Sequence, residues 1–225
     1  MKSFVIASSK PWHLESYKRF KKKNDIKSFY ATDTKTINLI LKKKNKSIKY
    51  IFFLHWNWKV PGKIFQKYEC ICFHMTDLPK GRGGSPLQNL ILDGKKKTTI
   101  CAFRMTDLLD SGPIYIKKKI NLNGRAEDIY KNVSKVCFDM ISYIIRNGPI
   151  PKDQKGSPTF FKRRNPKQSL LPKNISLSKI NDYIRMLDAP TYPLAFIEHG
   201  FYKFEFSFSK LFKDNIEARV KITKK

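Results

Sequence analysis

Short apolar runs alternate with amphipathic segments through the first half of the chain, and this alternation limits the fold more than any other feature. Each run is short enough for a strand and is bounded by turn-forming residues. The expected strands cover residues 3–8, 26–31, 49–54, 70–74 and 99–105. The expected helices between them cover residues 14–22, 34–43 and 86–92, with Thr34 at the N-cap position of the second. This order is typical of an open, Rossmann-like α/β fold with a mostly parallel sheet and helices on both faces.

The segment 126–146 gives the strongest helix prediction in the chain. Its apolar residues recur at helical spacing: Ile129, Val133, Val136, Met140 and Ile144. Glu127 and Asp128 suit the positive N-terminal end of a helix, and Gly148 suits its C-terminal cap. We expect this helix to pack on the sheet and assign it no chemistry.

The character of the chain changes after Gly148. Prolines and glycines at positions 149, 151, 156 and 158 form a connector. Beyond it, the pattern predicts a strand at 159–164, a helix at 178–187 and strands within 196–212 and 216–222. We therefore expect two domains, an α/β domain over residues 1–148 and a small C-terminal α+β region over residues 149–225.

The formal net charge of +28 indicates an anionic partner, such as nucleic acid, a nucleotide or an anionic membrane. An alternative is that the many Lys residues are solvated side chains that reflect a coding bias. No apolar run approaches the roughly 20 residues of a spanning helix. The N-terminal segment MKSFVIASSKPWH lacks the apolar core of a signal peptide. We therefore expect a cytoplasmic protein.

The four cysteines do not predict a metal site. Cys70 and Cys72 form a C-x-C pair within an expected strand, and Cys101 and Cys137 are isolated. No second pair has the spacing of zinc ligands. Alternation along the strand places Cys70 and Cys72 on one side of the sheet, as structural thiols.

The stretch FHMTDLPKGRGGSPLQNLILDG, residues 73–94, carries the first candidate site. Its three closely spaced glycines free the backbone to approach a ligand, although their spacing matches neither a dinucleotide fingerprint nor a P-loop. His74 ends a strand, where ligands of α/β sheets bind. The alternatives are a structural His and a flexible turn before a helix that begins with Pro86.

The segment LLDSGPIY, residues 108–115, adds a carboxylate, that of Asp110. Asp before Ser-Gly-Pro is a good turn former. A His and a carboxylate from neighbouring strand ends also make a general base and the group that orients it.

Taken together, these pieces resemble the 10-formyltetrahydrofolate-dependent formyltransferases. The shared order is strand–His–x₃–Leu-Pro–x₂–Arg-Gly–x₂–Pro, a short helix, a strand, and then Leu-Asp-x-Gly-x-Ile. The resemblance is best over residues 52–120. The family includes methionyl-tRNA formyltransferase, glycinamide ribonucleotide formyltransferase and nucleotide-sugar N-formyltransferases.

The resemblance implies a catalytic arrangement. His74 is the general base that removes a proton from the attacking amine, and Asp110 orients it and helps to pass the proton to the departing folate nitrogen. The co-substrate is 10-formyltetrahydrofolate. The resemblance implies that the folate is contacted by Arg82, Gly83, Gly84, Pro86 and Leu109. It implies that the acceptor is contacted by Thr76 and Lys10.

One position departs from the family. Where the family has an amide two residues before the His, this chain has Cys72, and a thiol is a weak donor. Loss of one donor to an oxyanion typically costs about 10²–10³ in rate. His55 or Asn57, after the third expected strand, is a candidate for the missing hydrogen-bond donor. The alternative is that this segment is a loop packed by its aromatic residues. The remaining alternatives are a slow enzyme and a protein that only binds.

The acceptor is predicted from the C-terminal part. A tRNA formyltransferase normally carries a further β-barrel, so the chain looks short, and the segment NDYIRMLDAPTYPLAFIEHG resembles sugar formyltransferases. We therefore expect transfer to an amino sugar linked to a nucleotide, with phosphates near Lys10, Lys59 or Lys80. The alternatives are a methionyl-tRNA or nucleotide-precursor formyltransferase, and an impaired member that binds formyl-folate or RNA.

Overall fold

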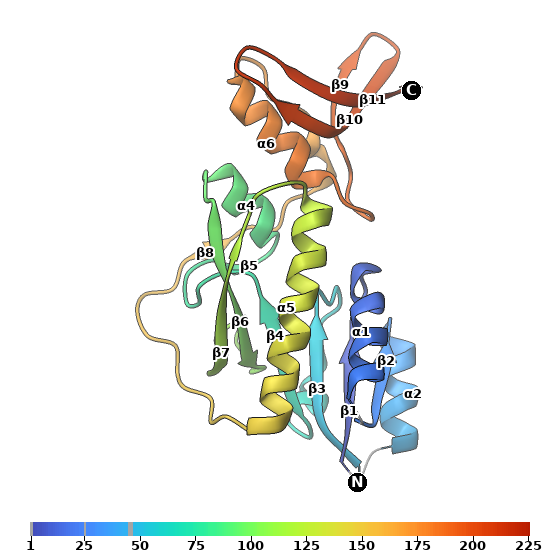
Figure 1. Ribbon diagram of the computed structural model, residues 1–225, viewed down its shortest axis with the longest axis vertical. Coiled ribbons are helices and arrows are strands. Elements are labelled where there is room, and N and C mark those ends of the chain that lie inside the picture. Colours follow the sequence, from blue (N-terminus) through green and yellow to red (C-terminus); the bar gives the residue numbers. More distant parts are fainter. Residues whose placement is uncertain (1, 25, 45–46) are drawn as a thin grey trace. The chain divides into compact units, whose positions relative to one another are not determined.

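The structure is a computed structural model that describes residues 2–24, 26–44 and 47–225 (Figure 1). The chain forms two compact units. Unit 1 comprises Met1–Gly83, Thr99–Ile120 and Lys131–Phe160, and unit 2 comprises Gly84–Thr98, Asn121–Tyr130 and Phe161–Lys225. The chain therefore passes between the units several times. The domain boundary expected after residue 148 stays a prediction.

A six-stranded sheet lies largely in unit 1, with the strand order β2-β1-β3-β4-β6-β7. Its strands are β1 (Ser3–Ala7), β2 (Ser28–Ala31), β3 (Ile48–Leu54), β4 (Glu69–His74), β6 (Lys97–Arg104) and β7 (Ile114–Asn121). The pairs β1–β2, β1–β3 and β3–β4 are parallel, and β4–β6 is antiparallel. The mostly parallel α/β fold is confirmed. The direction of β6 could not be predicted, because a strand has the same periodicity in both directions.

Helices cover both faces of this sheet, as predicted (Figure 1). On one face, α2 (Thr34–Lys44) and the short α3 (Gly62–Phe65) pack over a buried cluster. The cluster includes Val5, Ala7, Ala31, Ile37, Leu41, Ile51, Phe53, Ile64 and Cys70. On the other face, α1 (Trp12–Lys23) contacts the unit 1 part of α5 (Ala126–Asn147), with the rings of Phe20 and Phe138 at 5.4 Å. Cys72 packs on the same cluster as Cys70, as strand alternation predicts.

The first turn of α2 is capped by Asp33 and not by Thr34. The carboxylate of Asp33 accepts a hydrogen bond from the backbone N–H of Thr36 at 2.8 Å. This bond is the largest cause of a lowered pKa for Asp33, since it favours the charged form. Thr34 is the first helical residue, so the cap lies one position earlier than expected.

Unit 2 combines two helices with a small antiparallel sheet. The helices are α4 (Pro86–Leu92) and α6 (Leu177–Leu187), with a 3₁₀ turn, η2 (Pro166–Ser169). The strands are β9 (Ala195–His199), β10 (Tyr202–Leu211) and β11 (Ile216–Lys224), in the order β11-β10-β9. Ser176 caps α6 by accepting a hydrogen bond from the N–H of Lys179 at 3.3 Å. The helix and strands expected here are present, but the strand expected at 159–164 shortens to β8 (Phe160–Phe161).

None of the helices in the described part of the chain is long and apolar enough to span a bilayer.

Candidate functional site

The carboxyl ends of three neighbouring strands carry the candidate site of unit 1. Because β1, β3 and β4 are parallel, their carboxyl ends lie at one edge of the sheet. Leu54, the last residue of β3, pairs with Phe73, so His55 directly follows β3 and His74 ends the neighbouring β4. Strand ends of this kind are where ligands of open α/β sheets bind.

His74 is held from both sides of its ring, and its side chain is only 9% exposed. Nε2 lies 2.7 Å from the carbonyl oxygen of Gly81. A carbonyl only accepts, so Nε2 carries a proton and donates it. In the neutral ring the basic nitrogen is therefore Nδ1, which lies 3.7 Å from the Oδ2 atom of Asp110. The structure thus brings together the His and the carboxylate that the sequence singled out.

The position of Asp110 is set by a small network. Its Oδ2 accepts a hydrogen bond from the N–H of Gly83 at 2.8 Å. Gln154 Nε2 donates to the carbonyl oxygens of Asp110 (2.8 Å) and Gly112 (2.9 Å), while its Oε1 accepts from Arg82 Nη2 (2.7 Å). Gln154 lies in the Pro- and Gly-rich connector, so sequence reasoning missed it. No local pattern marks a side chain whose partners are more than 40 positions away.

The loop after β4 closes on itself through Gly81. Its carbonyl oxygen accepts from His74 and, at 3.4 Å, from the hydroxyl of Thr76, and its N–H donates to the hydroxyl of Thr159 at 2.8 Å. Gly81 has φ 69° and Gly83 has φ 107°, which glycine adopts without strain. Thr76 is buried inside this loop, and its predicted contact with the acceptor stays a prediction.

Cys72 is a protonated thiol beside this network. Burial raises its pKa well above the ordinary value, and the negative charge of Asp110 raises it further. The thiolate is the nucleophilic form of cysteine. The side chain at position 72 is therefore no nucleophile at neutral pH, and it remains a weak hydrogen-bond donor.

The other predicted contacts fall in different places. Leu109 and its neighbour Leu108 are exposed on the loop that holds Asp110. Lys10 is half-buried, with Nζ 5.7 Å from the centre of the Trp12 ring. Lys59, Lys80 and Asn57 are exposed. For these residues the structure fixes positions, and their roles stay predictions.

Gly84 and Pro86 belong to unit 2, where they have a structural explanation. A Cβ on Gly84 would come within 2.6 Å of the Cβ of Arg163, so close packing favours glycine there. Pro86 is the first residue of α4, where its missing N–H costs nothing. Their predicted contacts with a folate stay predictions.

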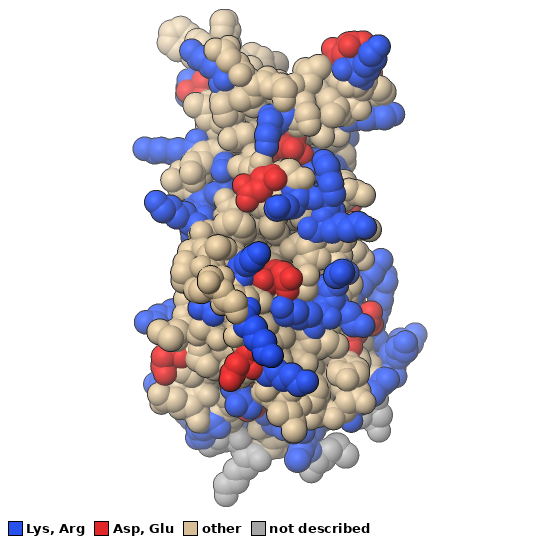
Figure 2. Space-filling model, turned by 90° about the vertical axis from the view of Figure 1, so that its left-hand side faces the viewer, with Lys and Arg blue, Asp and Glu red and all other residues tan. Residues whose placement is uncertain are grey.

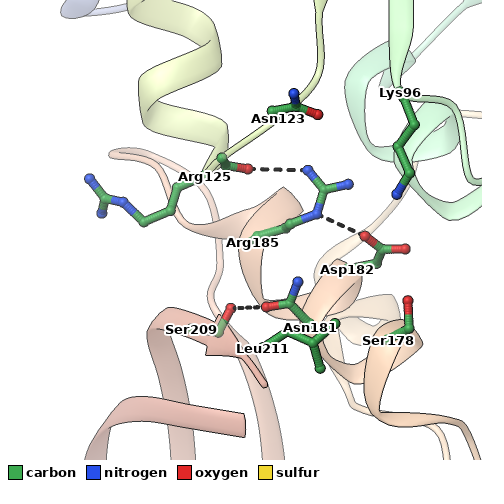
Figure 3. A pocket seen from close by; sticks show the side chains of 10 residues that line it. Lys96, Asn123, Arg125, Ser178, Asn181, Asp182, Arg185, Ser209 and Leu211 are labelled. Atoms are coloured by element: carbon green, nitrogen blue, oxygen red, sulfur yellow. Dashed lines mark hydrogen bonds and ion pairs between the residues drawn. The ribbon is translucent and has the colours of Figure 1, made fainter. Parts of the chain in front are cut away.

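Unit 2 contains a polar pocket of about 280 Å³ (Figure 3). It is lined by Lys96, Asn123, Gly124, Arg125, Ser178, Asn181, Asp182, Arg185, Ser209 and Leu211. The buried Arg185 donates from Nε to Asp182 at 2.8 Å and from Nη1 to the carbonyl oxygen of Leu122 at 2.7 Å. Lys96 points toward the carboxylate of Asp182 in the view of Figure 3. The pocket is therefore lined by side chains that can donate hydrogen bonds and by a carboxylate that can accept them.

Beside this pocket, β10 bulges and exposes an aromatic ring. The register shifts between Ser207 and Lys210, and Phe208 has φ 54°. Its N–H donates to the carboxylate of Asp188 at 2.7 Å, which holds the bulge. The guanidinium groups of Arg125 and Arg219 lie 4.1 Å and 4.4 Å from the centre of the Phe208 ring. Sequence patterns did not predict this cluster, because a bulge breaks strand alternation.

Within the described residues, no group of three or more His, Cys, Asp and Glu side chains is arranged to hold a metal ion.

Comparison with known proteins decides the family. The solved structure of methionyl-tRNA formyltransferase from Clostridium thermocellum superposes with a TM-score of 0.93 at 41% sequence identity, and the match covers 100% of both chains. This chain belongs to the methionyl-tRNA formyltransferase family. The model of the methionyl-tRNA formyltransferase C-terminal domain matches residues 166–223. The sequence-based assignment to the formyltransferases is confirmed.

Curated relatives agree over shorter stretches. Methionyl-tRNA formyltransferase of Rickettsia prowazekii (strain Madrid E) is 41% identical over 92 residues, which are 40% of this chain and 29% of that protein. That of Rickettsia felis (strain ATCC VR-1525 / URRWXCal2) is 34% identical over 117 residues, 50% of this chain and 38% of that protein. These matches span about a third of the curated relatives' length.

The predicted amino-sugar acceptor is wrong. A likely sugar N-formyltransferase from Mycobacterium tuberculosis is only 15% identical, with a TM-score of 0.68 and coverage of 89% of this chain and 93% of that chain, so it shares the fold alone. The segment at 181–200 that suggested a sugar lies within the residues matched by the methionyl-tRNA formyltransferase C-terminal domain. The length argument also fails, because the Clostridium structure has the same extent.

Proposed function

We propose that this protein transfers a formyl group from 10-formyltetrahydrofolate to the amino group of methionyl-tRNA. The observation that carries the proposal is the His74–Asp110 pair, in a chain that matches a methionyl-tRNA formyltransferase structure over its full length. The bound folate would supply a formyl group on a nitrogen that can depart.

His74 is placed to act as the general base. Nε2 is committed to the carbonyl oxygen of Gly81, so Nδ1 receives the proton that the attacking amine loses. The carboxylate of Asp110, 3.7 Å away, stabilises the imidazolium that forms. The proton held at Nδ1 is then available to the departing nitrogen. Gly83 and Gln154 keep Asp110 in place during both transfers.

The loop beside this pair has features that fit the folate. Among the residues that the structure describes, none accepts a hydrogen bond from the buried Nε of Arg82. A buried donor without an acceptor is costly, and a polar ligand atom would satisfy it. Leu108 and Leu109 offer an exposed apolar surface close to Asp110 in sequence, which suits the flat ring system of a folate.

The charge of the protein and the Phe208 cluster support an RNA acceptor. Lys and Arg side chains are spread over the visible face with fewer acidic side chains between them (Figure 2), and the net charge is +28. Phosphates of RNA are attracted to such a surface. The exposed ring of Phe208, with two guanidinium groups close to it, is also a surface on which an unpaired base can stack. An acceptor of this kind implies a cytoplasmic enzyme, because charged tRNA is made and used there.

The proposal is tested by supplying both acceptors. The purified protein is incubated with 10-formyltetrahydrofolate and either methionyl-tRNA or a nucleotide-linked amino sugar. After hydrolysis of the tRNA ester, N-formylmethionine is measured by mass spectrometry. We expect formylmethionine at a rate far above that of the His74→Ala variant. Equal, background rates for both proteins with methionyl-tRNA would contradict the proposal.

A further inference from the structure

The polar pocket of unit 2 is built around a buried ion pair. Asp182 and Arg185, on adjacent turns of α6, are only 6% and 8% exposed. Nε of Arg185 donates to Oδ1 of Asp182 at 2.8 Å, and its Nη1 donates to the carbonyl oxygens of Leu122 (2.7 Å) and Gly124 (3.1 Å). The guanidinium is therefore anchored between α6 and the segment that joins β7 to α5.

Each member of this pair has one polar atom left over. In the part of the chain that the structure describes, no residue hydrogen-bonds to Nη2 of Arg185 or to Oδ2 of Asp182. Figure 3 shows both atoms on the side of the pair where Lys96 enters the pocket. A buried charged pair is stabilised when further hydrogen bonds satisfy its remaining protons and lone pairs. The pocket therefore offers a donor and an acceptor, from one ion pair, to the group that fills it.

A side-chain amide adds another donor from the same helix. Oδ1 of Asn181 accepts a hydrogen bond from the hydroxyl of Ser209 at 2.8 Å, and this bond orients the amide. The amide nitrogen then points toward Arg185 in the view of Figure 3. Ser178, also on α6, is exposed and lines the pocket as well. The lining residues that the structure describes thus include several donors but one carboxylate, that of Asp182.

These groups match the edge of a nucleobase. A base has a ring nitrogen or carbonyl oxygen that accepts a hydrogen bond close to an N–H that donates one. Arg185 can donate to the first and Asp182 can accept from the second, and unpaired bases of RNA are recognised through such edge contacts. A bare phosphate fits this place less well, because the carboxylate of Asp182 repels it.

The size of the pocket suits a single nucleoside. Sites for small molecules usually have volumes of about 300–1,000 Å³. This pocket, at about 280 Å³, is at the low end of that range. Leu211 supplies an apolar part of the wall, against which the face of a base can lie.

The surroundings suit the rest of a polynucleotide. Lys96 belongs to an exposed run of three lysines, residues 95–97, which attracts phosphates. Arg125 also lines the pocket, and its guanidinium lies 4.1 Å from the centre of the exposed Phe208 ring. A second base can stack on that ring. One side chain therefore connects the pocket with the stacking surface.

We propose that the pocket of unit 2 holds one unpaired base of the RNA acceptor. Arg185 and Asp182 read the edge of the base, and Lys96 binds a phosphate beside it. The identity of the RNA rests on the proposed formyl transfer to methionyl-tRNA, whereas binding of a nucleotide can be measured without that reaction. The pocket then determines specificity and takes no part in the chemistry of His74 and Asp110.

Small ligands test the pocket in the absence of formyl transfer. The full-length, ¹⁵N-labelled protein is titrated with the four nucleoside 5′-monophosphates, with ribose 5-phosphate and with inorganic phosphate. We expect at least one nucleotide to bind ~10-fold more tightly than ribose 5-phosphate, which is the usual worth of a good pair of hydrogen bonds to a base. The same nucleotide should shift the side-chain amide signal of Asn181, which Asn181→Ala identifies. Ribose 5-phosphate that binds as tightly as every nucleotide, or an Asn181 signal that does not move, would overturn the inference.

Asp182→Asn changes the edge that the pocket accepts. The amide oxygen can still accept from Nε of Arg185, but an N–H₂ donor replaces the remaining carboxylate oxygen. We expect the preferred nucleotide to bind about 10-fold more weakly, while binding of ribose 5-phosphate is unchanged. Circular dichroism shows whether the variant is folded, and Asn181→Ala, at a half-buried position, takes its place if it is not. Unchanged nucleotide binding by the folded variant would contradict recognition of a base in this pocket.

The RNA itself is tested with two matched lysine variants. Lys96→Gln removes an exposed lysine of the pocket, and Lys118→Gln removes an exposed lysine of β7. We expect only Lys96→Gln to raise KM for methionyl-tRNA, with kcat unchanged. Equal KM values would show that Lys96 binds no phosphate of the RNA. Nucleotide binding at Asn181 without formation of formylmethionine would count against the proposed function alone, and formylmethionine without nucleotide binding at Asn181 would count against the pocket alone.

Discussion

At the scale of single residues, the candidate site depends on which nitrogen or sulfur atom carries a proton. The carbonyl oxygen of Gly81 fixes the tautomer of His74, so the basic nitrogen faces Asp110. Burial keeps the Cys72 thiol protonated. Neither property could be read from the sequence, since both depend on atoms that only the fold brings together.

Replacement of His74 by Ala is expected to lower the rate of formyl transfer by about 10²–10⁴, the usual contribution of a general base. The rate is measured with saturating methionyl-tRNA. The matched control is His199→Ala, because His199 is an exposed histidine in β9. A His74→Ala variant that turns over like this control would show that the base lies elsewhere.

Replacement of Cys72 by Ser is expected to reduce activity by less than ~10-fold, because a weak thiol donor is exchanged for a hydroxyl donor of similar size. A protonated thiol also forms no formyl thioester. Mass spectrometry of the quenched enzyme should therefore find position 72 unmodified. Cys137→Ser, at a buried site in α5 with a raised thiol pKa, reports the effect of the exchange on stability alone. Trapping of a formyl group on Cys72 would move the chemistry onto the thiol.

At the scale of elements, the sequence predicted which segments form strands and helices but placed several details wrongly. Apolar periodicity identified β1, β3, β4 and α5, since a buried strand or helix face repeats at a fixed interval. It did not show the cap at Asp33, the direction of β6 or the brevity of β8. The candidate site divides in the same way. His74 and Asp110 each lie in a short segment with a recognisable pattern, whereas the contacts of Gln154 and His13 are with residues distant in sequence.

The loop that carries Asp110 depends on Gly112. A Cβ at this position would overlap the carbonyl oxygen of Arg104. Gly112→Ala is therefore expected to displace the loop and to lower the rate of formyl transfer by at least ~10-fold. The variant is expected to remain folded at the assay temperature, as its melting curve would show. In the control Gly62→Ala, the new Cβ meets only ordinary contacts of 3.6 Å or more. Equal rates for the two variants would show that the loop adapts without moving Asp110.

The cap of α2 has a predictable pH dependence. The folded pKa of Asp33 is lowered, mainly by the hydrogen bond from Thr36. Its stabilisation is therefore present above the unfolded pKa, about 3.9, and is lost as the pH falls through the folded value. Urea unfolding should find Asp33→Ala less stable than the wild type at pH 7, with a difference that shrinks below pH 4. A difference that is constant over this range would contradict the capping role.

At the scale of the whole molecule, the net charge of +28 and the exposed Phe208 cluster bear on the acceptor. The excess of Lys over Arg favoured merely solvated lysines over a nucleic-acid interface. A basic surface alone attracts any polyanion, so general attraction must be separated from a specific contact. The salt dependence of binding makes that separation, because each phosphate contact contributes to the slope of affinity against salt.

Arg219→Gln removes one guanidinium from the Phe208 cluster, and Arg19→Gln removes one from the exposed surface of α1, where Arg19 pairs with Glu15. Both variants have the same net charge. If the cluster contacts tRNA, only Arg219→Gln should weaken binding of methionyl-tRNA and reduce the slope of log affinity against log salt by about 1. Fluorescence anisotropy at several salt concentrations measures both quantities. Equal slopes for the two variants would show that the cluster is not a contact and that tRNA is drawn only by the overall charge.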